Sequence, residues 1–263
     1  MRTQLGFPCR LLVSLLAVLL SGCQSRSPSP STIGPPLRVF IRASPKTHGL
    51  GEHDYPRFLA DWTKLLNERG AVTDGALTFP TEQQLDRADV LLVYAADAGS
   101  MSAADRAHLQ AYLRRGGGIV VLHDGICGKD ADWFKTVIGG AKQHGVTNWS
   151  RGNIRLHFGN TAHPIIQGVS DFDLDDEMFY RLQMMPEAKV LATTPHGDKE
   201  IVPQIWAYEK GDSRAFVWCQ GHYYASFSLP HVRTLLLRGI AWAGKRDVEL
   251  LTRLEERPGL KSR

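Results

Sequence analysis

Gly116-Gly117-Gly118-Ile119-Val120-Val121-Leu122-His123-Asp124 joins a glycine-rich turn to an apolar run. Its three glycines end a helical pattern, and a short run of apolar residues follows without a polar interruption. A run that is apolar at every position is typical of a strand buried on both faces, as in a parallel sheet. The stretch therefore predicts a helix, a turn and a buried strand whose carboxyl end carries a histidine and an aspartate.

The rest of the chain alternates between strand and helix patterns in the same way. Strands are expected at 37–42, 89–95 and 215–219, and helices at 55–69, 102–115, 133–138 and 232–243. Such alternation predicts an α/β fold, with a mainly parallel, doubly wound sheet that carries helices on both faces. In this architecture ligands bind beyond the carboxyl ends of the strands.

The N-terminal segment has the pattern of a secretion signal. Arg2 and Arg10 precede an apolar run at 11–20, which is too short to span a bilayer. The run ends in Leu20-Ser21-Gly22-Cys23, which resembles the lipobox of bacterial lipoproteins. We expect a lipoprotein signal peptide at 1–22 and a lipid on Cys23, which would anchor the exported protein to a membrane on its periplasmic or cell-surface side. An ordinary cleaved signal or an uncleaved anchor is the alternative.

The exported part is expected to consist of one domain. A Ser/Pro-rich tether occupies 23–36, an α/β domain 37–244 and a C-terminal tail 245–263. The formal net charge of the whole chain is +4, and loss of the two signal-peptide arginines leaves +2. A charge so near neutral, with acids and bases interspersed, argues against a nucleic-acid partner.

Two cysteines, Cys127 and Cys219, remain in the predicted domain. They could form a disulfide if their strands are neighbours, which the sequence leaves open. Gly125-Ile126-Cys127-Gly128 resembles the start of a nucleophile turn, but the second glycine of that motif is replaced by Lys129. The predicted strand also ends before Cys127, so we do not expect this thiol to be a nucleophile.

Histidines follow three separate predicted strands. His48 and His53 lie in the loop after the first strand, together with Glu52 and Asp54. His123 and Asp124 end the strand at 119–122, and His222 follows the strand at 215–219. One histidine at a strand end is more often a hydrogen-bonded structural residue than a ligand. Three that reach the same edge of a sheet predict a functional site.

Two further segments carry groups of the same kind. His163 lies in a proline-fixed turn, and Asp175-Asp176-Glu177 precedes the aromatic pair Phe179 and Tyr180. The acidic run could equally be a solvated turn or a helix start. Imidazole and carboxylate together are the usual donors for zinc, manganese or iron, although no tight spacing such as His-Glu-x-x-His occurs.

In the order and spacing of these fragments the chain resembles the ThuA-like (trehalose utilisation) proteins. The matching fragments are THGLGEHDY at 47–55, GGGIVVLH at 116–123, HPI at 163–165, DEMFY at 176–180, GH at 221–222 and LRGIAWA at 237–243. The resemblance implies a flavodoxin-like fold of the class I glutamine amidotransferase-like type, without the amidotransferase cysteine. It also implies a role in breaking down trehalose and other disaccharides through 3-keto sugars.

Together these observations favour a metal-assisted enzyme acting on keto-sugars or glycosides. The expected metal ligands, for zinc or manganese, are His53, His123, Glu177 and His222, and Glu177 is included because of the resemblance and the need for a carboxylate. The expected catalytic residues are His123, Glu177 and Asp124, and the expected sugar-binding residues are His48, Tyr180 and Tyr223. Phe179 and Tyr224 could add to an apolar floor, unless these aromatics are core residues.

The competing hypothesis is a non-catalytic, cell-surface sugar-binding lipoprotein. Aromatic and acidic side chains serve sugar binding equally well. Several imidazoles with pKa values near neutrality favour acid–base or metal chemistry instead, since a simple sugar pocket has little need of them.

Overall fold

The structure is a computed structural model that describes residues 1, 34–143, 149–159 and 162–253. The expected signal peptide, Cys23 and the tether up to residue 33 lie outside the described residues. Contacts divide the chain into Met1–Gly34 and Pro35–Arg263, and the account below concerns the second unit. Within the described ranges, every helix is too short or too polar to cross a membrane.

One half of the main sheet is parallel, as the apolar strand patterns predict. Its strands lie in the order β2, β1, β3, β4, β12, and every neighbouring pair is parallel. The bounds are β1 Arg38–Arg42, β2 Val72–Ala76, β3 Val90–Tyr94, β4 Gly118–Leu122 and β12 Ser213–Trp218. This is the strand order of flavodoxin-like sheets. The α/β, flavodoxin-like prediction is confirmed.

The other half of the nine-stranded sheet is antiparallel and continues from β12 through β11, β10, β7 and β8. Its bounds are β7 Trp149–Phe158, β8 Phe172–Phe179, β10 Lys189–His196 and β11 Glu200–Lys210. A small separate sheet contains β5 Cys127–Gly128, β6 Gly140–Gln143 and β9 Gln183–Met184. Asp175-Asp176-Glu177 lies inside β8, so the alternative of a solvated turn or helix start is wrong.

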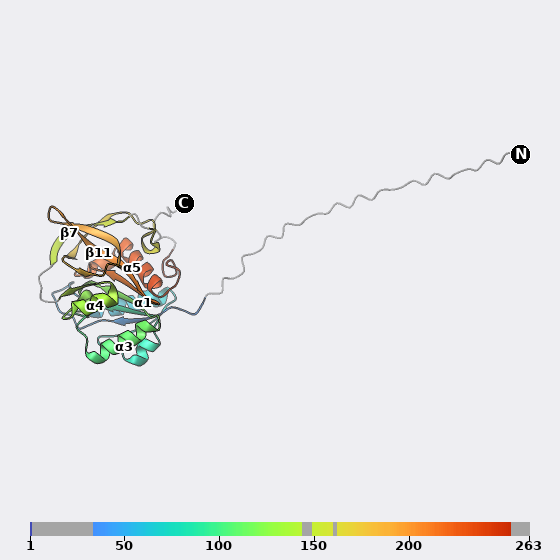
Figure 1. Ribbon diagram of the computed structural model, residues 1–263, viewed down its shortest axis with the longest axis horizontal. Coiled ribbons are helices and arrows are strands. Elements are labelled where there is room, and N and C mark those ends of the chain that lie inside the picture. The colour runs from blue at the N-terminus through green and yellow to red at the C-terminus, as the bar shows by residue number, and fades with distance from the viewer. Residues whose placement is uncertain (2–33, 144–148, 160–161, 254–263) are drawn as a thin grey trace. The chain divides into compact units, whose positions relative to one another are not determined.

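Helices cover both faces of the parallel half (Figure 1). α1 Tyr55–Glu68 and α5 Pro230–Ala243 contribute to one hydrophobic cluster. α2 Glu82–Asp86, α3 Ala103–Arg114 and α4 Ala131–Ile138 contribute to a second cluster on the opposite face. Successive residues of β4 alternate between the two clusters, because side chains of a strand point to opposite faces. The sheet is therefore doubly wound.

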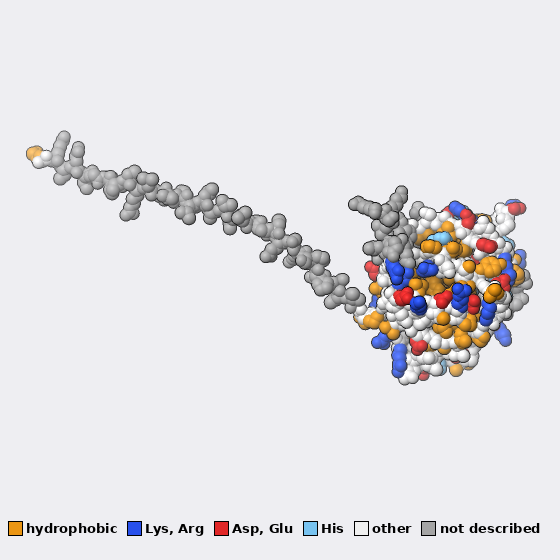
Figure 2. Space-filling model, turned by 180° about the vertical axis from the view of Figure 1, so that it is seen from behind, with side chains coloured by type: hydrophobic (Ala, Val, Ile, Leu, Met, Phe, Trp, Pro, Cys, Tyr) orange, Lys and Arg blue, Asp and Glu red, His pale blue; other side chains and the backbone are white. Residues whose placement is uncertain are grey.

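Local sequence explains where these helices begin and which face they bury. Ser102 caps α3 in a reciprocal capping box with Asp105. In α1 the buried residues Tyr55, Phe58, Trp62 and Leu66 recur at helical spacing. Figure 2 shows acidic, basic and apolar side chains interspersed over one face of the unit, in keeping with its near-neutral charge.

The expected C-terminal tail packs on the domain over its described part. Leu251 is 1% exposed, and its carbonyl accepts a hydrogen bond from Arg69 at 2.8 Å. Arg238 of α5 forms an ion pair with Glu249 at 2.5 Å. The compact unit thus extends past residue 244.

Candidate metal centre

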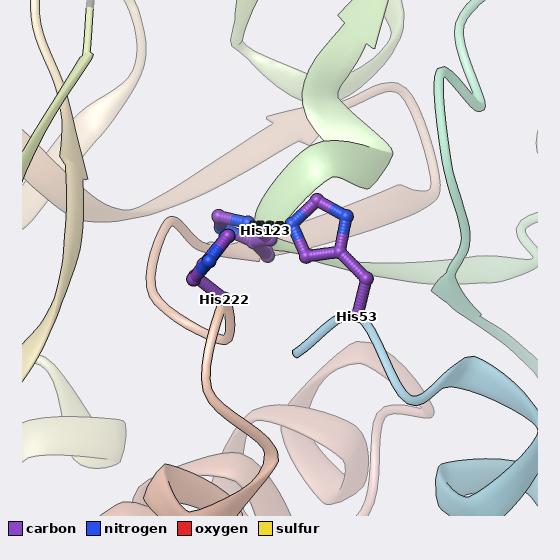
Figure 3. A group of neighbouring side chains, drawn as sticks. All are labelled: His53, His123 and His222. Atoms are coloured by element: carbon purple, nitrogen blue, oxygen red, sulfur yellow. Dashed lines mark hydrogen bonds between the residues drawn. The ribbon is translucent and has the colours of Figure 1, made fainter. Parts of the chain in front are cut away.

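The three strand-end histidines meet at the carboxyl edge of the parallel sheet (Figure 3). His53 lies in the loop before α1, His123 directly follows β4, and His222 lies four residues after β12. Nε2 of His53 lies 3.0 Å from Nε2 of His123 and 2.9 Å from Nδ1 of His222. The three nitrogens lie within 4.8 Å of one another, and all three residues are buried. Their ring nitrogens therefore form a single cluster.

Unusual backbone conformations bring these side chains together. His53 and His123 have φ values of 41° and 49°, in the left-handed region that residues with a Cβ rarely adopt. The His53 N–H donates to the His222 carbonyl at 2.9 Å, which joins two of the loops directly. Gly221 has φ 131°, and a Cβ there would lie 2.7 Å from Phe227, so a side chain at this position would clash. Strain of this kind is typical of functional sites.

Neighbouring groups orient the imidazoles of His123 and His53. Nδ1 of His123 donates to the Cys219 carbonyl at 2.9 Å, which leaves Nε2 to face the cluster. Nδ1 of His53 lies 2.9 Å from the Tyr55 hydroxyl and 3.1 Å from the Thr47 hydroxyl. Hydrogen bonds from the far nitrogen are the usual way in which proteins orient metal-binding histidines.

Burial favours the neutral form of His53 and His222. Burial, with a further contribution from neighbouring His123, lowers the pKa of His53 from its usual 6.5 to about 2. Burial and His123 also lower the pKa of His222 to about 4. Because a metal binds the unprotonated nitrogen, neutral imidazoles are the form that a metal centre requires.

Two carboxylates and one arginine border the cluster. Oε2 of Glu177 lies 3.5 Å from Nδ1 of His222, and Oε1 of Glu52 lies 3.3 Å from Nε2 of the same ring. Arg151 pairs with Glu177 at 3.3 Å and with Glu52 at 3.5 Å. Burial raises the pKa of Glu177, whereas the hydrogen bond with His222 lowers the pKa of Glu52. The two carboxylates therefore differ in their affinity for a proton.

The residues of the cluster fit a divalent metal ion. Zinc–nitrogen distances of about 2.0–2.1 Å place two nitrogens on one ion roughly 3–4 Å apart, close to the separations of His53 from its two partners. Three imidazoles with a nearby carboxylate oxygen are suitable donors for zinc or manganese. The described residues thus provide three nitrogen ligands, with Glu177 beside them.

Asp176 is a positioning residue that the sequence did not single out from its acidic neighbours. Its fully buried carboxylate accepts hydrogen bonds from the Gly221 N–H at 3.1 Å and the His222 N–H at 2.9 Å. It also accepts a hydrogen bond from the Ser226 hydroxyl. Asp176 therefore holds the backbone that carries His222.

Three other residues that the sequence predicts for the site, His48, Tyr223 and Asp124, differ in their contacts with the cluster. The ring of His48 lies 3.8 Å from that of His53, and the ring of Tyr223 lies 4.9 Å from that of His222. Asp124 interacts with Tyr55 and Cys127 and raises the pKa of both groups, after the larger effect of burial. Asp124 thus belongs to the hydrogen-bonded surroundings of His53.

The aromatic residues that were expected to form an apolar floor for a sugar lie in different parts of the structure. Phe179 is buried and stacks on His123, with ring centroids 5.1 Å apart. The Tyr224 hydroxyl donates to Asp61 at 2.6 Å, which makes this residue part of the packing against α1. Tyr180 stacks on His196 at 3.8 Å. Of the four aromatics, Phe179 and Tyr223 contact the histidine cluster.

His163 lies elsewhere in the fold. Its ring contacts Trp242 near the end of α5, at 5.0 Å between centroids. The end of α5 packs on Gly118, at the start of β4 and hence at the opposite edge of the sheet from His123. Burial lowers the pKa of His163 to about 4. We therefore assign His163 to the packing of α5.

Cys127 and Cys219, the cysteines among the described residues, are both free and buried. Burial raises the pKa of the Cys127 thiol, with a further contribution from Asp124, so the nucleophilic thiolate is disfavoured. Cys127→Ala is expected to cost about 1 kcal/mol of stability through the small cavity it leaves and to retain most of the turnover of the wild type. Loss of turnover in a folded Cys127→Ala protein, or covalent trapping of Cys127 by substrate, would show that the thiol reacts.

Several residues of the site were not assigned a role from the sequence, namely Thr47, Glu52, Tyr55, Arg151 and Asp176. Glu52 was visible beside His53, and the alternation of β8 would have separated Asp176 from Glu177 had that strand been recognised. Arg151 carries no local signal, because its place is set by the antiparallel pairing of β7 with β8.

The fold and the histidine cluster define an α/β protein with a candidate metal centre at the carboxyl edge of a flavodoxin-like sheet. The chain belongs to the ThuA family, described as trehalose utilisation, whose model matches residues 46–243. The family resemblance drawn from the sequence is confirmed, and with it a relation to carbohydrate use. A search of curated proteins finds no match to the chain.

Solved structures support the fold. A ThuA-like protein from Bacteroides uniformis is 18% identical with a TM-score of 0.64, covering 82% of this chain and 95% of its own. A ThuA-like protein from Parabacteroides merdae is 15% identical with a TM-score of 0.65, covering 80% of this chain and 90% of its own. Part of a β-galactosidase from Rahnella sp. R3 is also similar, at 15% identity and a TM-score of 0.54, over 77% of this chain and 31% of the enzyme.

Proposed function

We propose that this protein is a metal-assisted enzyme that acts on keto-sugars or glycosides. The observation that carries the proposal is the convergence of three buried imidazoles on one point with Glu177 beside them. A purely structural cluster would not require three ring nitrogens to face one another in a strained backbone. The family's link to trehalose utilisation points to a sugar as the substrate.

His53, His123 and His222 would hold the metal, with Glu177 beside them. A divalent ion supplies a Lewis acid that stabilises negative charge developing on a substrate oxygen. His123 has both nitrogens committed, one to the Cys219 carbonyl and one to the cluster, which favours a ligand over a base. Glu177 is then the better candidate for the base.

Glu177 can exchange a proton because burial raises its pKa while Arg151 holds its carboxylate in place. A ketone at C3 of a sugar acidifies the C–H bond at C2. Glu177 would take that C2 proton, the electron pair would form a C1–C2 double bond, and the C1–O bond to the departing sugar would break. The departing oxygen then takes up a proton, so the products are an unsaturated keto-sugar and a free sugar.

Substrate contacts are proposed for residues that border the cluster. Tyr223 borders the cluster through its ring contact with His222. It also lines a cavity of about 570 Å³ with Gly51 and Asp175, but the three histidines are not among the lining residues of that cavity. His48 borders the cluster through its ring contact with His53. Tyr180 stays a proposal from the sequence, and its ring stacks on His196, which is not a member of the cluster.

The proposal is tested with the zinc- or manganese-loaded protein and two probes, trehalose and its 3-keto derivative, followed by nuclear magnetic resonance of the products. We expect conversion of the keto-disaccharide and its loss in Glu177→Gln. Binding without conversion of either sugar would contradict the enzyme proposal and favour a sugar-binding lipoprotein.

The proposed location is the outer side of a membrane, with the lipid on Cys23. Cys23→Ser is expected to move the protein from the membrane fraction to the soluble fraction or to leave it unprocessed, because the variant has no thiol to carry the lipid. Fractionation and mass spectrometry of the mature N-terminus measure this. A variant that stays in the membrane fraction, with a wild-type N-terminus that carries no lipid, would contradict the anchor.

A further inference from the structure

One face of the paired strands β7 and β8 carries a row of side chains that extends from the histidine cluster. In the register of this pair Trp149 lies opposite Phe179, Arg151 opposite Glu177, and Asn153 opposite Asp175. Directly opposed residues of antiparallel strands point to the same side of the sheet. Since Phe179 stacks on His123 and Glu177 lies beside His222, this row of side chains starts at the cluster.

Trp149 is 42% exposed, although its partner Phe179 is buried. The guanidinium of Arg151 lies over its indole ring, 5.3 Å from the centroid. Because Arg151 also pairs with Glu52 and Glu177, the arginine is tied to the cluster and fixes one face of the indole beside it. A large, partly exposed aromatic ring next to a polar site is a surface on which the apolar face of a sugar ring can lie.

We propose that Trp149 is the stacking platform for a sugar ring of the substrate. This inference rests on the proposed function and names where that substrate lies. The charge of Arg151 is balanced by two carboxylates, so the platform has no spare positive charge for a phosphate. It fits a neutral saccharide rather than a sugar phosphate.

The test compares Trp149→Ala, Trp149→Phe and the matched control Trp133→Ala in the zinc-loaded protein. Trp133 also lies under an arginine, Arg106 at 4.3 Å, but it belongs to α4 and packs on Phe134. Isothermal titration calorimetry with a panel of neutral mono- and disaccharides, and with their phosphorylated counterparts, measures binding. Zinc titration of each apo protein measures the metal centre separately.

We expect Trp149→Ala to weaken binding of the best neutral saccharide about tenfold, Trp149→Phe to weaken it less, and Trp133→Ala to leave it unchanged. Zinc affinity should be the same in all four proteins. The platform is ruled out if Trp149→Ala binds sugars like the wild type, if the wild type binds no neutral saccharide, or if it prefers the phosphorylated counterparts. If the wild-type protein binds no zinc in the titration, the proposed function itself is rejected.

Discussion

His123→Ala is expected to lower the affinity for zinc by at least about 100-fold, because it removes one of three nitrogen ligands. His123 is fully buried, and its Nδ1 satisfies the Cys219 carbonyl, so the variant should also lose about 1–3 kcal/mol of stability. Competition titration against a chelating dye measures the affinity, and urea unfolding of the apo protein shows whether the variant is folded.

His157→Ala is the matched control for that experiment. This histidine is exposed on β7 and pairs with Asp171 at 2.8 Å, away from the ring nitrogens of the cluster. The His157→Ala variant should bind zinc with the same affinity as the wild type. Equal zinc affinity in folded His123→Ala and in the wild type would contradict the ligand assignment.

Asp176→Ala is expected to destabilise the protein by about 3–5 kcal/mol, because it leaves buried donors without an acceptor. The N–H groups of Gly221 and His222 and the hydroxyl of Ser226 all donate to this carboxylate. Release of the Gly221–His222 backbone should also weaken metal binding, although Asp176 is not expected to touch the metal. Urea unfolding measures the stability.

Asp173→Ala provides the comparison on the same strand. Asp173 is half exposed and pairs with Arg155 on the surface, so its loss should cost less than about 1 kcal/mol. If Asp176→Ala is no less stable than Asp173→Ala, the buried network does not hold the His222 loop as described here.

The parallel half of the fold follows from the sequence because its strands and helices carry strong local patterns. The strand at 118–122 is apolar throughout, and α1 repeats its apolar residues at helical spacing. The general rule for the carboxyl edge of such sheets then predicts that His53, His123 and His222 lie together. Their convergence required no knowledge of side-chain packing.

The antiparallel half and the carboxylate surroundings could not be predicted in this way. β7 and β8 alternate polar and apolar residues over only part of their length, and their pairing depends on contacts between distant segments. The register alone decides that Arg151 faces Glu177, and the strand alternation decides that Asp176 points inward to the His222 loop. Local pattern cannot distinguish neighbouring carboxylates when the strand itself is not recognised.

The metal content of the purified protein shows whether His53, His123 and His222 form a metal centre. The protein is incubated with excess zinc or manganese, desalted, and analysed for metal beside a variant in which His53, His123 and His222 are all replaced by alanine. The account predicts about one equivalent of metal in the wild type and almost none in the variant, with circular dichroism showing that both are folded. A wild type that retains no metal, or a folded variant that retains as much as the wild type, would contradict it.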